Sequence, residues 1–149
     1  MDRINAAFGI SSKFVPYRPN YDFVCDWITQ NTWHYANKNF ACSAVDTYEY
    51  TGYSVTVPAY QVFEIAFTDR YSNAEPIAIC ISDNADPTTL SGAHMLAEST
   101  GKTSTGSSYS DRCVSTLTPK LDYVNTYYVH VKHGGTGNNR VALAYRRIV

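Results

Sequence analysis

The stretch HVKHGGTGNNRVALAY, residues 130–145, has the residue types of a ligand-binding loop, because three glycines and two asparagines separate two apolar runs. Such a loop binds phosphate when a helix follows it, since the amides at the helix start point at the anion. The residues that follow here alternate as a strand does. The stretch therefore predicts the tip of a β-hairpin, where glycine and asparagine tolerate the positive φ angles of a tight reversal.

A second phosphate-like motif, Gly101-Lys102-Thr103, matches only the end of a P-loop. The first glycine of that motif would stand at position 96, which is Leu96. The flanks also lack the preceding strand and the following helix that give the motif its geometry. We expect a flexible loop here, and neither nucleotide binding nor any other cofactor.

The four histidines do not form a metal-binding pattern. His130 and His133 lie three residues apart on a strand-like run, and residues with that spacing point to opposite faces of a strand. His34 and His94 have no acidic or cysteine neighbour at ligand spacing. We expect four ordinary histidines and no metal site.

The loop SDNADP, residues 82–87, offers oxygen ligands of the kind that calcium prefers, on Asp83, Asn84 and Asp86. The spacing is not that of an EF-hand, and Asp and Asn before proline are also the residues of ordinary turns. A turn is the favoured interpretation, and a calcium loop is the alternative.

Hydrolytic chemistry has no linear signature in this sequence, which lacks both GxSxG and HExxH. Two carboxylates that meet in space would still make a glycosidase dyad, which a sequence alone does not reveal. The candidates are Asp46, Glu49, Glu64, Asp69 and Glu75. Without a motif to support them, we predict a protein that is not an enzyme.

Five aromatic residues in polar surroundings form the strongest candidate for a binding surface: Trp33, Tyr35, Tyr48, Tyr50 and Tyr53. Flat rings with a polar edge suit protein interfaces and stacking on sugars, because they bring a large contact area at a low cost in rotamer entropy. Packing in the core or at the edges of the domain is the first interpretation of these residues, subunit contact the second and glycan stacking the third. We predict glycan or partner binding as their functional role.

Length and composition indicate one β-rich domain. The chain has 149 residues, with 13 Tyr, 6 Phe and 2 Trp, and a net charge of −1. That length is usual for a single domain, and β-branched and aromatic residues favour strands. The balanced charge argues against nucleic acid as a partner. No window approaches the ~20 apolar residues of a membrane span, so we expect no membrane contact.

The four cysteines, Cys25, Cys42, Cys80 and Cys113, include no CxxC pair. Cys80 and Cys113 lie in strand-like runs, which favours buried structural thiols over reactive ones. The N-terminus carries charge early and has no apolar core of a signal peptide, so we expect a chain that folds with reduced thiols. An even count leaves two disulfides open as an alternative.

The chain divides into an extended arm at residues 1–22 and a single domain at residues 23–149. Prolines at positions 16 and 19 lie among aromatic residues and remove backbone donors, which argues against a core strand. Such an arm docks on its own domain or on a neighbour. The residues that we expect to make these assembly contacts are Phe14, Val15, Tyr17 and Tyr21.

Within the domain, alternation predicts strands at 53–57, 60–67, 76–82, 112–117, 122–132 and 140–148, with a weaker one near 93–97. Residues 32–55 alternate only weakly, and we expect short strands and long loops there. No long amphipathic helix is visible that could connect parallel strands. The pattern predicts an all-β fold, an antiparallel β-sandwich or jelly roll of about seven to nine strands.

The runs YSVTVPAYQVFEIAF, YSNAEPIAICIS and YYVHVKHGGTGNNRVALAYRRIV, within residues 50–149, resemble the small β-sandwich domains of bacteriophage virion surface proteins. These include head fibres, capsid decoration proteins and tail-tip appendages. The resemblance implies a structural protein of the virion, made in the host cytoplasm, whose partners are other virion proteins or copies of itself. Similar sandwiches serve as carbohydrate-binding modules, so attachment to a host-surface glycan is the alternative.

Overall fold

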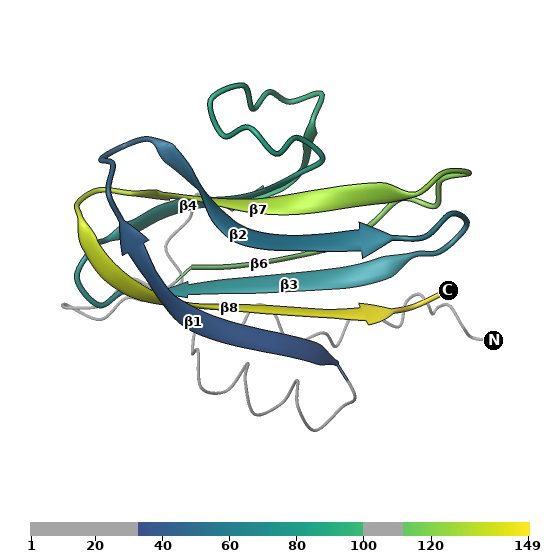
Figure 1. The fold of residues 1–149 in the computed structure, drawn as a ribbon, viewed down its shortest axis with the longest axis horizontal. Helices are drawn as coiled ribbons and strands as arrows, with labels where there is room; N and C mark the ends of the chain where they lie inside the picture. Colours follow the sequence, from purple (N-terminus) through teal and green to yellow (C-terminus); the bar gives the residue numbers. More distant parts are fainter. Residues whose placement is uncertain (1–32, 100–111) are drawn as a thin grey trace.

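The computed structural model describes residues 33–99 and 112–149, and these form eight strands and no helix (Figure 1). The strands are β1 (His34–Cys42), β2 (Tyr48–Val57), β3 (Phe63–Arg70), β4 (Pro76–Ser82), β5 (Met95–Ser99), β6 (Arg112–Leu117), β7 (Asn125–His133) and β8 (Gly137–Arg147). Within these ranges there is no helix with the length and hydropathy of a membrane span. The predicted arm at 1–22, with its four assembly residues, lies outside the described residues.

The eight strands form two antiparallel sheets of four, which pack face to face. One sheet has the order β1-β8-β3-β6 and the other the order β2-β7-β4-β5. Among the described strands, β4 and β5 are the only consecutive pair that share a sheet as neighbours. Every other connection crosses from one sheet to the other. This is the strand order of a jelly roll, and the predicted fold class is confirmed.

The core lies between the sheets and follows the alternation of the strands. Ile65 and Phe67 of β3 face Ile79 and Ile81 of β4 across it, and all four side chains are almost fully buried. Burying each such side chain contributes roughly 1.5–3 kcal/mol to folding. The remaining members are valines and leucines at the inward positions of β2, β6, β7 and β8, together with Tyr127.

The predicted strands are found with shifts at their ends. The prediction at 76–82 matches β4, whereas 60–67 begins too early, because Tyr60 has a φ of 64° and turns the chain before β3. Residues 32–55 hold two long strands, β1 and most of β2, where we expected short ones. β1 is an edge strand that carries the polar residues His34 and Lys38 among its inward positions, which hides its alternation.

The glycine-rich stretch 134–137 is not a hairpin tip, and that prediction is wrong. β7 pairs with β2 and β4, while β8 pairs with β1 and β3, so the stretch carries the chain across the core from one sheet to the other. Val129 and Val131 before it, and Val141 and Leu143 after it, do face the core as predicted. The residue pattern identifies which face of each strand is buried. A hairpin and a crossing connection bury the same faces, so the pattern does not distinguish them.

The jelly-roll order places the connections at two opposite ends, and the long 83–94 connection folds back over the outer face of its own sheet (Figure 1). We call one the glycine end; it comprises the connections 43–47, 71–75 and 134–136. We call the other the groove end; it comprises the connections 58–62, 83–94 and 118–124 and the last two residues, 148–149.

Candidate functional site

The groove end carries most of the exposed apolar surface of the described residues. Large hydrophobic side chains that remain exposed there are those of Tyr60, Leu117, Tyr123, Val124, Ile148 and Val149. Within the described ranges, Val45 at the glycine end is the only other exposed large hydrophobic residue. Contiguous apolar surface of this kind marks a site that contacts a partner.

Two connections at this end are tied together around Tyr60. The Tyr60 amide donates to the carbonyl of Leu121 over 2.6 Å, which joins the β2–β3 connection to the β6–β7 connection. Its φ of 64° lies in the left-handed region, which is unfavourable for a residue with a side chain. The ring is 63% exposed, so core packing does not explain this backbone conformation. Strain that persists in an exposed loop is common where a surface is shaped for contact.

The long β4–β5 connection folds through a series of side-chain turns. Ser82 Oγ accepts from the Asn84 amide, Asn84 Oδ1 accepts from the Asp86 amide, and Asp86 Oδ1 accepts from Thr88. The hydrogen bonds from Thr88 lower the pKa of Asp86. These oxygens cap backbone amides, as the turn interpretation of SDNADP requires. The residues that the structure describes contain no metal-binding group of three His, Cys, Asp or Glu side chains.

The same connection is held against the outer face of its sheet by His130. His130 is fully buried, and its Nε2 atom lies 2.8 Å from the carbonyl oxygen of Asn84. Burial lowers the pKa of His130, so the ring is neutral at physiological pH and donates this hydrogen bond through Nε2–H. His130 therefore fixes the start of the loop that forms one wall of the groove.

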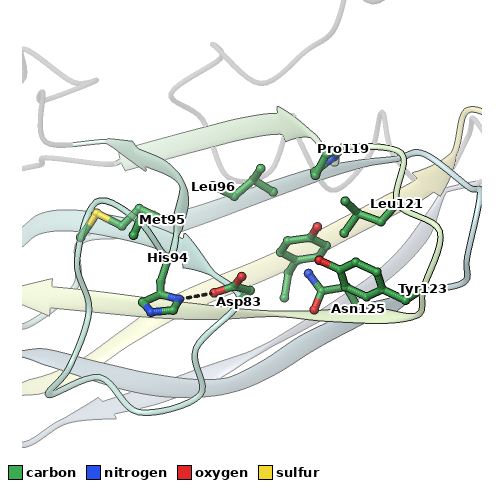
Figure 2. Close-up of a pocket in the computed structure, with 10 residues that line it drawn as sticks. Asp83, His94, Met95, Leu96, Pro119, Leu121, Tyr123 and Asn125 are labelled. Carbon is green, nitrogen blue, oxygen red and sulfur yellow. Dashed lines mark hydrogen bonds and ion pairs between the residues drawn. The ribbon is translucent and has the colours of Figure 1, made fainter.

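The groove lies between the β4–β5 and β6–β7 connections and has a volume of about 200 Å³ (Figure 2). It is lined by Asp83, Ala93, His94, Met95, Leu96, Pro119, Leu121, Tyr123, Asn125 and Tyr127. In Figure 2 the Asp83 carboxylate, the Asn125 amide and the Tyr123 ring lie on one side, with Leu96, Leu121 and Pro119 beyond them. One wall is polar and the other is apolar.

An aspartate–histidine pair closes the polar wall. His94 Nδ1 lies 2.9 Å from Asp83 Oδ1, and the Asp83 amide donates to the His94 carbonyl over 3.1 Å. Both side chains remain open to solvent, at 50% for His94 and 38% for Asp83. Deeper in the groove, burial raises the pKa of the Tyr127 hydroxyl and a hydrogen bond with Asn125 partly offsets this, so the hydroxyl stays protonated. This wall therefore presents both hydrogen-bond donors and hydrogen-bond acceptors to a ligand.

The predicted aromatic surface is not one surface. Trp33 is buried beneath the Arg146 guanidinium, whose carbon lies 4.6 Å from the ring centre. Tyr35 lies on the outward face of β1, and its hydroxyl accepts from Asn37. Tyr53 points into the sandwich and packs edge-on against Phe67. These three residues lie apart from the remaining two.

Tyr48 and Tyr50 do share a face, the outer face of the second sheet. Tyr48 donates to Glu98 over 2.5 Å, and Tyr50 packs on Tyr128 and His130. The strand alternation of YEYTGY already places Tyr53 opposite these two, a signal that was present in the sequence. Binding by the five residues as one platform is not supported, and Tyr48 with Tyr50 is the part that could contribute.

Two of the five candidate carboxylates, Glu64 and Asp69, are too far apart to form a dyad. Glu64 and Asp69 lie five residues apart on opposite faces of β3, which separates them by about 17 Å at the usual rise per residue. Glu49 accepts hydrogen bonds from Ser43 at the glycine end. None of the five candidates is among the residues that line the groove.

A buried polar cluster at the glycine end was not foreseen. His133 Nε2 lies 2.7 Å from Asp69 Oδ2, and Asn139 donates to Asp69 Oδ1 over 3.1 Å. Asn139 Oδ1 in turn accepts from the amides of residues 72–74. His130 and His133 are both fully buried, which their positions in the sequence did not indicate. The cluster has no exposed side chain, so it stabilises the crossing connection and has no access to a substrate.

The cysteines in the described ranges are structural, as expected for Cys80 and Cys113. Cys42, Cys80 and Cys113 are all buried. Burial raises the pKa of Cys42 and of Cys80 to about 12, which keeps both as unreactive thiols at neutral pH. Cys25 lies outside the described residues.

No protein-family model and no curated protein matches this chain.

Proposed function

We propose that the chain is a non-enzymatic surface protein of a virus particle, which works by protein–protein contact through its groove end. The observation that carries the proposal is the gathering of exposed apolar side chains at that end, Tyr60, Tyr123 and Val124 foremost. A soluble domain seldom exposes such a cluster unless a partner covers it. The partner is another virion protein or a second copy of the chain.

The strand order supports the assignment to virion surface proteins by analogy. Eight-stranded jelly rolls recur in viral capsid proteins and in lectins, where rigid sheets present loops at one end. A fold alone does not determine function, so this analogy favours the proposal and does not carry it. The chemistry agrees, because the Asp69–His133 pair is fully buried, and the groove beside the exposed Asp83–His94 pair is lined by no serine, threonine or cysteine that could act as a nucleophile.

The test is particle association. Virus particles purified from the organism that carries the gene, and washed in high salt, are expected to contain the chain when they are examined by mass spectrometry. A double variant, Tyr60→Ser with Val124→Ser, should fold normally and be lost from the particles. The matched control is Val45→Ser, which removes an equally exposed apolar side chain at the other end. Particles without the chain would refute the virion assignment.

The N-terminal arm remains a prediction of this proposal. Deleting residues 1–20 is expected to leave a folded domain that no longer assembles. Light scattering of both forms tests this: a monomer before and after deletion contradicts a role for the arm in self-assembly.

Attachment to a glycan is the second candidate function, and the groove favours it. An attachment protein needs a small site that is open to solvent and combines polar and apolar walls, which is the character of the groove lined by Asp83, Tyr123 and Leu121. The two candidates share Tyr123, so both hold together where the virion partner covers Tyr60 and Val124 and leaves the groove open.

A further inference from the structure

We propose that the groove between the β4–β5 and β6–β7 connections binds one uncharged sugar ring, such as the terminal residue of a surface glycan. This inference rests on the glycan-attachment candidate and gives it a site and a ligand class. It also moves the sugar site from the predicted aromatic residues 33–53 to residues that the sequence did not single out.

The size of the groove limits the ligand to something small. Its volume of about 200 Å³ lies below the ~300–1,000 Å³ of sites that take drug-sized molecules. At ~30 Å³ for each water, it holds roughly six or seven of them, which suits a ring of about a dozen non-hydrogen atoms. A single monosaccharide fits, whereas a longer oligosaccharide would extend out over the rim.

The charge of the lining argues against an anion. Asp83 provides a carboxylate, and the residues that line the groove include no lysine or arginine. Phosphates, nucleotides and acidic sugars need such cations or a helix N-terminus, and the described residues form no helix. The polar groups that remain, an imidazole, an amide and two phenols, suit a neutral ligand with many hydroxyl groups.

The arrangement of the walls matches the two-sided nature of a sugar. A pyranose has a flat face of C–H groups and an edge of hydroxyls. Leu96 and Leu121 offer apolar contact to the face, and Tyr123, whose ring is 56% exposed at the rim, offers a flat surface for stacking. Asn125 and Asp83 lie on the same side of the groove as Tyr123, opposite the two leucines, and meet the hydroxyl edge (Figure 2).

The Asp83–His94 pair prepares this wall for hydroxyl groups. Asp83 uses Oδ1 to hold the His94 ring. Its Oδ2 atom accepts no hydrogen bond from the residues that the structure describes, and it is therefore available to a ligand hydroxyl. Hydrogen bonds to a carboxylate are roughly twice as strong as neutral ones, so Asp83 is the main polar contact in this site.

The experiment is a titration of the full chain with neutral monosaccharides, followed by ligand-observed and amide NMR. The probes are glucose, galactose, mannose and N-acetylglucosamine, with sialic acid as the acidic comparison. Binding of at least one neutral sugar is expected, with a dissociation constant in the millimolar range that is usual for a small ligand at an open site. Amide shifts should centre on residues 83–96 and 119–127.

Two variants test whether the sugar binds in the groove. Tyr123→Ala and Asp83→Ala are each expected to weaken binding tenfold or more, while Val45→Ala, which removes an exposed apolar side chain at the glycine end, leaves it unchanged. Unfolding curves of all three verify that the fold is intact. Absence of neutral-sugar binding, a preference for sialic acid, or equal binding by the groove variants each overturns the inference. Particle association is measured separately, so a virion protein without a sugar site is recognised as such.

Discussion

Two aspartate–histidine pairs lie at opposite ends of the sandwich, and they have similar geometry in contrasting surroundings. His133 and Asp69 meet over 2.7 Å at the glycine end with no exposed surface on either side chain. His94 and Asp83 meet over 2.9 Å at the groove end, where 50% of the His94 side chain and 38% of the Asp83 side chain are exposed. The same two residue types therefore stabilise the fold at one end and shape an open site at the other.

The difference teaches that burial, and not residue type, decides which pair can act on a ligand. At the glycine end polar groups are enclosed and bonded to each other, while at the groove end apolar groups are exposed. Protein interiors are mostly apolar and protein surfaces carry most of the charged and polar side chains, so both ends depart from the usual distribution. The glycine end is consistent with a stabilising role and the groove end with recognition.

The largest effect is expected from breaking the buried pair. Asp69→Ala leaves Nε2–H of His133 and an amide hydrogen of Asn139 buried without an acceptor. Each such loss costs ~1–3 kcal/mol, so the free energy of unfolding should fall by roughly 4 kcal/mol. Chemical denaturation measures this decrease in the free energy of unfolding. The matched change, Asp83→Ala, should cost less than about 1 kcal/mol, because that pair is exposed. Equal costs would remove the contrast between the two ends.

The fold was predictable to the level of strands and buried faces because alternation depends on local sequence. Ile79 and Ile81 identify a core strand without any knowledge of its neighbours. Which strands pair is set by contacts distant in sequence, such as Val141 with Asp69, and the sequence pattern does not contain them. For this reason the crossing connection at 134–136 was interpreted as a hairpin.

Glu64 provides the next test, since it lies at the groove end of β3 and contrasts with Asp69 at the other end of the same strand. Burial raises the pKa of Glu64 from its ordinary 4.5 to about 7, and Arg146 only partly offsets this. The folded state then holds the proton more tightly than the unfolded chain does. Stability from Glu64 is therefore complete below pH ~4.5 and is lost as the pH rises to about 7.

Glu64→Gln should remove this pH dependence. The free energy of unfolding of the unmodified chain, relative to that of the variant, is expected to fall by about 3 kcal/mol between pH 4.5 and pH 8. Urea denaturation at a series of pH values measures this difference. Glu49→Gln is the control, because it makes the same chemical change at a carboxylate that is less buried than Glu64. Parallel curves for Glu64→Gln and the unmodified chain would mean that Arg146 keeps Glu64 ionised.

The crossing connection at the glycine end gives a third test, in which the expected loss of stability is smaller and the two variants differ only in the position of the substitution. Gly137 has a φ of 129°, and a Cβ atom there would lie 2.6 Å from Cβ of Asn73. Gly137→Ala is expected to reduce the free energy of unfolding by about 2 kcal/mol. Gly135→Ala is the matched control, because a Cβ there meets no atom within 4 Å. Similar thermal midpoints for the two variants would contradict a structural role for this stretch.

The groove was not predictable, because its residues are ordinary ones that only the fold brings together. Asp83 and Tyr123 are forty residues apart in sequence and come from connections of different strands. The aromatic residues at 33–53 attracted attention by their density, yet alternation and burial divide them between two sheets. Composition indicates that aromatic residues are many, whereas exposure, as at Tyr60 and Tyr123, indicates which ones a partner can reach.

The smallest expected effect concerns the strained backbone at Tyr60. A left-handed residue other than glycine costs roughly 1–2 kcal/mol, so Tyr60→Gly should be more stable than Tyr60→Ala by about 1 kcal/mol once the flexibility of glycine is counted. Differential scanning calorimetry measures the gap. If the two variants are equally stable, Tyr60 carries no strain. If the gap is found and Tyr60→Gly also loses its place in the particle, the groove end gives up stability to hold an exposed ring in position for a partner.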